Sequence, residues 1–432
     1  MTEIEAELDR YLKRLFPLCR SITGEPNRET LRILQEIIPL TIHEVATGTV
    51  VYDWIIPDEW TIRDAWIADA NGQRLVDFQV SNLHVMSYSE SVDAVMGWEE
   101  LQPHIHKHSD LPEAIPYRTS YYKRDWGFCV THAQYAELKK QQGELTVVID
   151  SELKPGSLSY GEILIPGQSS QEILLSCYIC HPSMANDSLS GVLLTAFLAR
   201  YIAELKDRHW SYRIVFVPET IGAIAYCALN EAAMKQIDIG LVITTVGGPG
   251  KFGYKNSFDP AHPINKVIKT VLIESDVDFI TYPFDIHGSD ERQYSSQGFG
   301  INVASIFKDK YYEYDYYHSS LDDLNFVSSK QVAETLSIYE GLIDKLEARR
   351  IFRRTNPYCE VMLSRHGLYQ VGGGALWPKY GGRSELDLIL WLLFLSDGKN
   401  DIRDIAAILQ ASSSELELLA DKLVEKGALV PC

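Results

Sequence analysis

The sequence predicts an α/β protein: a mainly parallel sheet with helices on both faces, joined to a small inserted β domain and a C-terminal winged helix. Three observations predict this. Between residues 174 and 345, short apolar strands alternate with helical patterns, as in a doubly wound sheet. Residues 49–156 are instead rich in aromatic and β-branched runs separated by turns. Residues 351–432 carry three helical patterns and a short apolar tail.

The composition fits a globular protein of several domains. With 432 residues, the chain is too long for one ordinary core. Its formal charge of −19 argues against nucleic acid or an anionic membrane surface as the main partner. Cysteines are few, no run of about 18 apolar residues occurs, and the N-terminus has no apolar signal core. We therefore expect a reducing, cytoplasmic location and no membrane association.

The elements can be expected in order along the chain. Two helices should fill residues 1 to about 45, the second over 29–38, with a break near Gly24 and Pro26. The Asn71-Gly72 pair is a hairpin signal within the β-rich segment. Later strands are expected at YRIVFVP, GLVITTV and INVASIF. Later helices are expected near 191–206, 223–236, 262–275 and 328–348.

These patterns predict three domains. Residues 1–48 and 157–350 should form the α/β domain, 49–156 the inserted β domain, and 351–432 the winged helix. A DNA-binding winged helix needs a basic face, but residues 383–432 hold five Lys/Arg against nine Asp/Glu, a net of −4. We therefore expect this module to bind a protein partner or to self-associate.

The stretch LLSCYICHPSMANDSLSGVLL, residues 174–194, carries the first chemical signal. An apolar strand ends at Cys180-His181, and Asp187 follows in a turn before a helical pattern. Ligands of open α/β sheets bind at carboxyl strand ends, and imidazole with carboxylate suits zinc. A strand-end histidine and a helix-capping aspartate are the structural alternative. Cys177 and Cys180 form a C-x-x-C pair, which we interpret as buried core cysteines.

Two later segments place similar residues after strands. Glu219 follows the strand ending at Pro218, where a carboxylate can act as a general base or simply complement a helix start. His318 follows the tyrosine-rich run YYEYDYY, which includes Tyr317. Either Asp322 or Asp323 could orient its second ring nitrogen.

Charged residues of unlike sign crowd a third segment, FDIHGSDERQY, before a strand. Its Asp290, Glu291 and Arg292 are candidate substrate-facing groups, the acids suited to an amine and the arginine to a carboxylate. A solvated loop is the alternative. The alternating His104, His106 and His108 lie in a proline-bounded segment that we interpret as a surface loop.

In this order the motifs resemble the zinc aminopeptidases, whose fold is shared with glutamate carboxypeptidase and glutaminyl cyclase. The phrases SITGE, DWIIPDEW, IPYRTSYY, WGFC, HPSMANDSLSG, PETIGAIAY, GSDERQY and YHSSLDDL resemble more closely a bacterial aminopeptidase-like family, over essentially the full chain. That family is uncharacterised in substrate and is often placed near polysaccharide biosynthesis. The resemblance implies a protease-associated-like β insert and a C-terminal winged helix.

The resemblance also implies roles for individual residues. His181 and His318 fall on histidine ligands, Asp187 on a bridging aspartate, and Glu219 on the general base. Tyr317 falls beside the last ligand, among the substrate-binding groups.

The chain departs from the peptidases at three places. Thr220 stands where they have a second glutamate, and Thr244 or Thr245 where they have an aspartate. Asp290-Glu291 replaces an Asp-His pair. Each of the two metals has thus lost one carboxylate.

We therefore predict one zinc, held by His181, Asp187 and His318, with water in the fourth position. The expected activity is hydrolysis of an amide bond in a small peptide, aminoacyl or amido-sugar substrate, as in a metallopeptidase. A glutaminyl-cyclase-like acyl transfer is one alternative. A non-catalytic member that binds zinc or a ligand is the other.

Overall fold

An eight-stranded mixed sheet forms the centre of the larger of two units. The computed structural model describes residues 2–368 and 384–432, and the chain divides into Met1–Ile343 and Asp344–Cys432. The strand order of the large sheet is β1-β10-β12-β11-β13-β16-β14-β15. In that order the strands are β1 (Thr41–Ala46), β10 (Ser157–Ile165), β12 (Ser211–Val217), β11 (Glu172–Tyr178), β13 (Ile239–Val242), β16 (Asn302–Lys308), β14 (Phe252–Lys255) and β15 (Phe279–Tyr282).

The middle of this sheet is parallel and its flanks are not. Strands β12, β11, β13 and β16 run parallel, whereas β1 pairs antiparallel with β10, β10 with β12, and β14 with β16. Every residue of β12 is buried, as is typical of a parallel strand covered on both faces. The predicted α/β class is therefore confirmed, with antiparallel strands added at the flanks.

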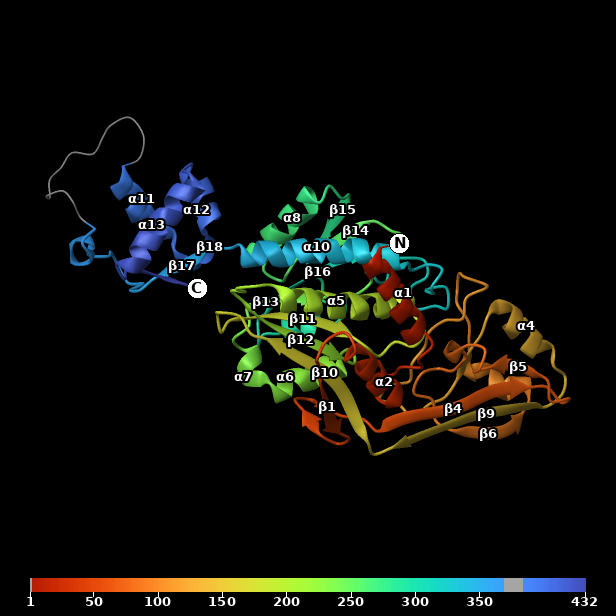
Figure 1. The fold of residues 1–432 in the computed structure, drawn as a ribbon. Coiled ribbons are helices and arrows are strands. Elements are labelled where there is room, and N and C mark those ends of the chain that lie inside the picture. The colour runs from red at the N-terminus through yellow and green to blue at the C-terminus, as the bar shows by residue number, and fades with distance from the viewer. Residues whose placement is uncertain (1, 369–383) are drawn as a thin grey trace. The chain divides into compact units, whose positions relative to one another are not determined.

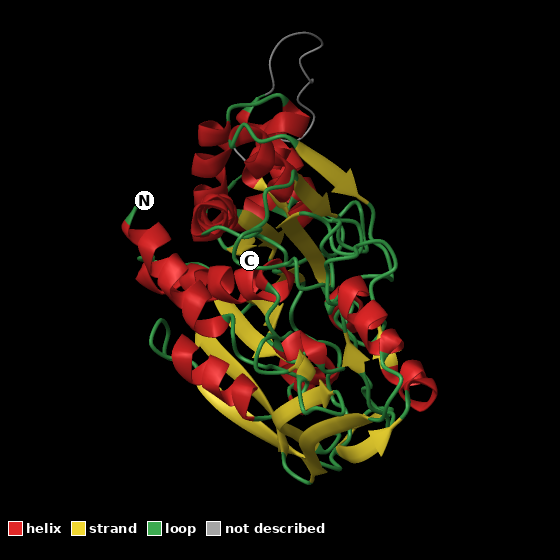
Figure 2. Ribbon diagram, turned by 90° about the vertical axis from the view of Figure 1, so that its right-hand side faces the viewer, coloured by secondary structure: helices red, strands yellow, loops and turns green. Residues whose placement is uncertain are grey.

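Helices cover both faces of the sheet (Figure 1, Figure 2). Helix α5 crosses from β11 to β12 and α6 leads from β12 towards β13, so right-handed crossovers place them on opposite faces. Outside the β-rich segment, the α-helices of residues 2–347 are α1 (Glu3–Leu15), α2 (Glu25–Leu34), α5 (Gly191–Glu204), α6 (Ile221–Leu229), α7 (Glu231–Met234), α8 (Pro263–Glu274), α9 (Glu291–Tyr294) and α10 (Ser329–Glu347).

Helix α2 begins four residues earlier than the sequence pattern predicts. Pro26 was expected to break the chain, but it lies in the first turn of α2, where its missing N–H has no helical partner to lose. The helix also ends earlier, at Leu34.

The β-rich segment folds into a four-stranded antiparallel sheet in the order β5-β4-β9-β6. It buries an apolar cluster of its own that includes Ile67, Val147 and Phe128. Its elements are β2 (Val50–Val51), β3 (Trp54–Ile55), β4 (Glu59–Ala68), β5 (Arg74–Asp77), β6 (Val92–Met96), α3 (Trp98–Leu101), β7 (Ile105–His106), β8 (Phe128–Cys129), α4 (His132–Lys140) and β9 (Leu145–Lys154). The domain boundaries at 48 and 156 stay a prediction.

The described residues 351–368 and 384–432 of the smaller unit form three α-helices and a three-stranded antiparallel sheet around one apolar core. These are β17 (Ile351–Arg354), α11 (Glu385–Leu395), β18 (Asp397–Asp401), α12 (Ile402–Leu409), α13 (Ser413–Glu425) and β19 (Leu429–Pro431). In the described part of the chain, no helix is long and apolar enough to cross a membrane.

Helix α5 packs closely against the sheet at its first residue, Gly191. A Cβ at Gly191 would collide with the backbone oxygen of Ile243 and lie 2.8 Å from Cα of Thr244. Because backbone cannot move aside as a flexible side chain can, we expect Gly191→Ala to lower the free energy of unfolding by about 2–3 kcal/mol. Urea denaturation measures this change.

Gly341 in α10 is the matched control. A Cβ there would lie 3.8 Å from Cγ1 of Val271, which is an ordinary contact. Alanine is also the better helix former, so Gly341→Ala should stabilise the protein by about 0.5–1 kcal/mol. Equal effects of the two substitutions would contradict the predicted close approach at Gly191.

Candidate metal site

Three potential metal ligands meet at the carboxyl end of the central strands. His181 follows β11, Asp187 lies in the turn before α5, and His318 lies in the loop between β16 and α10. One ligand atom from each lies within 4.8 Å of the others. His181 and Asp187 are almost fully buried, whereas the side chain of His318 is 34% exposed. The cluster therefore has a closed inner side and an outer side open to solvent.

The ligand atoms fit a metal better than they fit one another. Nε2 of His318 lies 3.1 Å from Oδ2 of Asp187 but makes no hydrogen bond, and it is buried from water. A buried polar atom without a hydrogen bond is costly, and a metal ion bound at Nε2 would satisfy it. Two imidazoles and one carboxylate are a donor set that zinc accepts at catalytic sites.

The surroundings of His181 and Asp187 favour the protonation states in which these two groups bind a metal. Burial lowers the pKa of His181 to about 4, so its imidazole is neutral at pH 7. Burial alone would raise the pKa of Asp187, but the neighbouring His181 and His318 outweigh it and lower that pKa to about 2. Neutral imidazole and ionised carboxylate are the forms that bind metal.

A hydroxyl network occupies the other oxygen of Asp187. The Tyr178 hydroxyl donates to Oδ1 at 2.5 Å and lies 2.7 Å from Oγ1 of Thr244, just beyond β13. Thr244 is one of the two threonines predicted from the sequence to stand in place of a ligand aspartate. In this chain that position holds a hydroxyl, and only Oδ2 of Asp187 faces His318.

Asp322 stabilises the turn that carries Asp187 through hydrogen bonds to its backbone. Asp322 is fully buried and accepts hydrogen bonds from the backbone N–H of Asn186 at 2.6 Å and of Asp187 at 2.9 Å. The prediction that Asp322 or Asp323 orients the ring of His318 was wrong, because both carboxylates bind other groups. Asp322 instead fixes the Asp187 turn, and Asp323 accepts from backbone N–H groups of its own loop.

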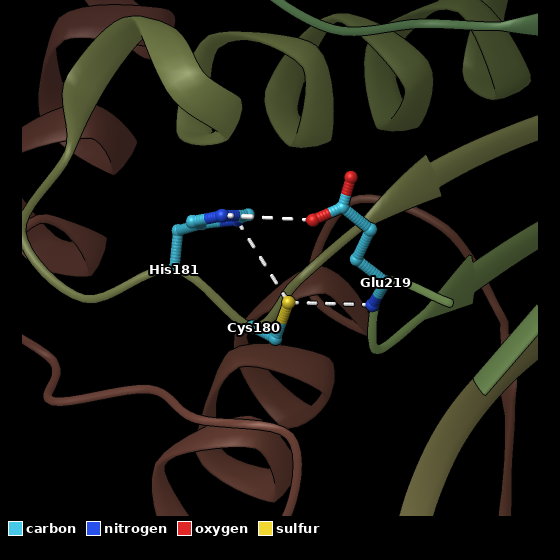
Figure 3. Close-up of side chains that lie close together, drawn as sticks. All are labelled: Cys180, His181 and Glu219. Atoms are coloured by element: carbon cyan, nitrogen blue, oxygen red, sulfur yellow. Dashed lines mark hydrogen bonds and ion pairs between the residues drawn. The ribbon is translucent and has the colours of Figure 1, made fainter. Parts of the chain in front are cut away.

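Glu219 lies next to this cluster, directly after β12. Its Oε2 is 3.7 Å from Nε2 of His181, and its side chain is 28% exposed (Figure 3). Burial in the site, helped by the negative charge of Asp187, raises the pKa of Glu219 to about 7. A carboxyl group whose pKa lies near neutral pH is suited to accept and return a proton.

The four predicted substrate-binding residues are placed differently from one another. Tyr317 stacks on the His318 ring with 3.9 Å between centroids, and Arg292 is exposed. Asp290 is buried, and its Oδ1 accepts a hydrogen bond at 2.7 Å from the backbone N–H of Thr220. The carboxylate of Glu291 is also buried, and both of its oxygens accept hydrogen bonds from protein groups. Tyr317 and Arg292 are thus at least partly exposed, whereas Asp290 and Glu291 are buried inside the protein.

Contacts between distant segments add two residues that sequence reasoning missed. Arg20 is buried, and its Nε donates to the backbone oxygen of His181 at 2.9 Å. Tyr117, from the β-rich segment, packs its ring against those of His181 and His318, with centroids 5.3 and 5.1 Å away. Its backbone N–H also donates to the oxygen of His318 at 2.8 Å. The only signal in the sequence was that Tyr117 lies in the phrase IPYRTSYY.

The fold places the chain among proteins with the aminopeptidase fold. It covers 94% of a zinc aminopeptidase from Bacillus subtilis with a TM-score of 0.55, over 79% of its own length and at 11% identity. A second solved structure, of an M28 peptidase precursor from Shewanella amazonensis, gives a TM-score of 0.55 at 14% identity over 79% of this chain and 92% of that one.

Closer relatives define the family. Residues 9–349 match a family described as a domain of unknown function, DUF4910, and residues 350–431 match a winged helix-turn-helix family. The chain belongs to the DUF4910 family. The predicted aminopeptidase-like fold and C-terminal winged helix are confirmed.

A similar sequence and a similar crystal structure both come from Clostridium acetobutylicum. One is 42% identical over 94% of this chain and 92% of its own, and is provisionally named a polysaccharide biosynthesis protein with an aminopeptidase-like domain. The other is a crystal structure, provisionally described as a peptidase, with a TM-score of 0.81 at 39% identity. It covers all of this chain, which in turn covers 97% of it.

Proposed function

We propose that the protein is a zinc-dependent hydrolase of an amide bond, with zinc held by His181, Asp187 and His318 and with Glu219 as the general base. The observation that carries this proposal is the buried Nε2 of His318, which makes no hydrogen bond and lies 3.1 Å from Oδ2 of Asp187, within reach of the other ligand atoms. Three protein ligands and an open side are typical of a catalytic zinc site rather than a structural one.

One zinc fits the residues better than two. Oδ1 of Asp187 accepts the Tyr178 hydroxyl, and Oδ2 is the oxygen that lies beside His318. The positions of the two missing carboxylates hold Thr220 and the Thr244–Thr245 pair, whose side chains are weak ligands for zinc. A single ion is sufficient for amide hydrolysis.

In this proposal, zinc and four residues of the chain have separate roles in amide hydrolysis. Zinc, when bound, supplies a Lewis acid that polarises a carbonyl and makes water more acidic. Glu219 would take the proton of the attacking water and pass it to the leaving amine, which its pKa near 7 allows. Asp290 would hold the turn at Thr220 and so aim Glu219. Tyr317 and Arg292 would contact the substrate at the open side.

For the substrate we propose a small peptide, aminoacyl or amido-sugar compound. The aminopeptidase fold supports an amide with a free amine, and the provisional name of the Clostridium relative supports an amino sugar. The winged helix would bind a protein rather than DNA, because residues 383–432 are net acidic. A cytoplasmic location stays a prediction.

One rival function has an observation in its favour. The exchange of two ligand carboxylates for threonines favours a non-catalytic member that binds a ligand in the same cleft. Retention of Glu219 beside the cluster opposes it, because binding alone needs no base.

Elemental analysis of untagged protein tests the proposal most directly. We expect about one zinc per chain, together with slow hydrolysis within a panel of amino-acid 4-nitroanilides and aminoacylated amino sugars. Two zinc ions per chain would restore a two-metal peptidase site. No zinc after incubation with zinc salt would contradict the proposed metal site, and zinc without turnover on the panel would favour the binding protein.

A further inference from the structure

Cys180 contacts both His181, a proposed zinc ligand, and Glu219, the proposed general base. Its Sγ lies 3.8 Å from Nδ1 of His181 and accepts a hydrogen bond at 3.3 Å from the backbone N–H of Glu219 (Figure 3). The side chain is 1% exposed, at the point where the chain leaves β11. One sulfur atom therefore links the predicted first ligand with the predicted base.

The two nitrogens of His181 face different groups. Nε2 lies 3.7 Å from the Glu219 carboxylate, whereas Nδ1 faces the sulfur. A histidine that binds metal through Nε2 carries its proton on Nδ1 and donates it to a neighbouring acceptor. That acceptor is usually a carboxylate, a backbone oxygen or water. At His181, the Cys180 sulfur occupies the position of the hydrogen-bond acceptor for Nδ1–H.

Resting on the zinc site proposed above, we propose that Cys180 is a positioning residue. Its sulfur accepts a hydrogen bond from the Nδ1–H of His181. The ring proton then stays on Nδ1, and the lone pair of Nε2 is free for zinc. The same sulfur accepts the N–H of Glu219 and so holds the base at a fixed distance from that ligand. The exchange of this one atom should therefore change metal affinity and turnover together.

Two other roles for Cys180 make different demands. As a metal ligand, together with His181 and Glu219, it would have to be a thiolate. As a plain core cysteine it would behave like Cys177, which is equally buried three residues earlier in β11.

Cys177 makes a matched control possible. We would compare Cys180→Ala, Cys180→Ser and Cys177→Ala in the full-length chain, measuring the zinc dissociation constant by chelator competition. Loss of an outer-shell partner typically weakens metal binding about 10–100-fold, which is the change expected for Cys180→Ala. Serine keeps an acceptor and should recover part of this loss, whereas Cys177→Ala should bind zinc like the parent. Urea denaturation of each metal-free variant separates a folding defect from a positioning defect.

The outcomes separate this role from the proposed function. Parent-like zinc affinity in Cys180→Ala would overturn the positioning role and leave the zinc site standing. Equal weakening by Cys180→Ala and Cys177→Ala, with no recovery in serine, would reduce Cys180 to core packing. A thiolate-to-cobalt charge-transfer band in the cobalt-loaded parent, absent from Cys180→Ala, would make it a ligand instead. Failure of the parent to bind zinc would overturn both proposals.

Discussion

Replacing Glu219 with glutamine is expected to abolish hydrolysis while leaving zinc bound. Glutamine keeps the size of the side chain but cannot accept the proton of the attacking water. General-base catalysis typically contributes about 10²–10⁴-fold, so kcat should fall by that factor. Zinc content should stay at the parent value, because the three proposed ligands are untouched. Initial rates on the best substrate of the panel and elemental analysis of the same sample measure both effects.

Glu313→Gln is the matched control for this substitution. Glu313 is exposed in the tyrosine-rich loop near the site, where it pairs with Lys310. Exposed ion pairs of this kind contribute little, so this variant should hydrolyse at the parent rate. Parent-like turnover in Glu219→Gln would remove Glu219 as the base, and loss of its zinc would make Glu219 a ligand.

The sequence predicted the parts of the fold that depend on local pattern. Strands β11 and β12 are buried on both faces, so their continuous apolar runs stand out from the neighbouring helices. The antiparallel flanks were not predicted, because the pairing of β1 with β10 joins residues more than a hundred positions apart across the β-rich segment. Apolar pattern identifies a strand but does not identify its neighbour.

The candidate site likewise has a part that the sequence predicted and a part that it did not. The predicted ligands and base each follow an apolar strand or a tyrosine-rich run, so their positions pointed to the edge of a sheet where ligands bind. Their supports could not be found, because they depend on contacts between distant segments. Arg20 reaches His181 across 161 residues, and Asp322 reaches Asn186 across 136. Nothing near Asp322 in the sequence distinguishes a support for the Asp187 turn from an orienting partner of His318.

Replacing His318 with alanine is expected to remove the metal. Two protein ligands would remain, and loss of a direct ligand should cost more than the about 100-fold upper range for an outer-shell partner. Zinc that binds only the folded chain stabilises it by about 2.7 kcal/mol at a concentration of 100 times the dissociation constant. The parent should therefore melt at a higher temperature when zinc is added, and His318→Ala should not. Differential scanning calorimetry with and without zinc measures this difference.

His287→Ala is the control, since His287 is an exposed histidine in a neighbouring loop. It should keep the zinc-dependent rise in melting temperature. If His318→Ala also kept it, together with one zinc per chain, the ion would have to use the other candidate group, Cys180, His181 and Glu219. Glu219 would then be a ligand whose lone pair is engaged by the metal, and it could no longer serve as the general base. The fate of zinc in His318→Ala therefore tests the ligand set and the base assignment together.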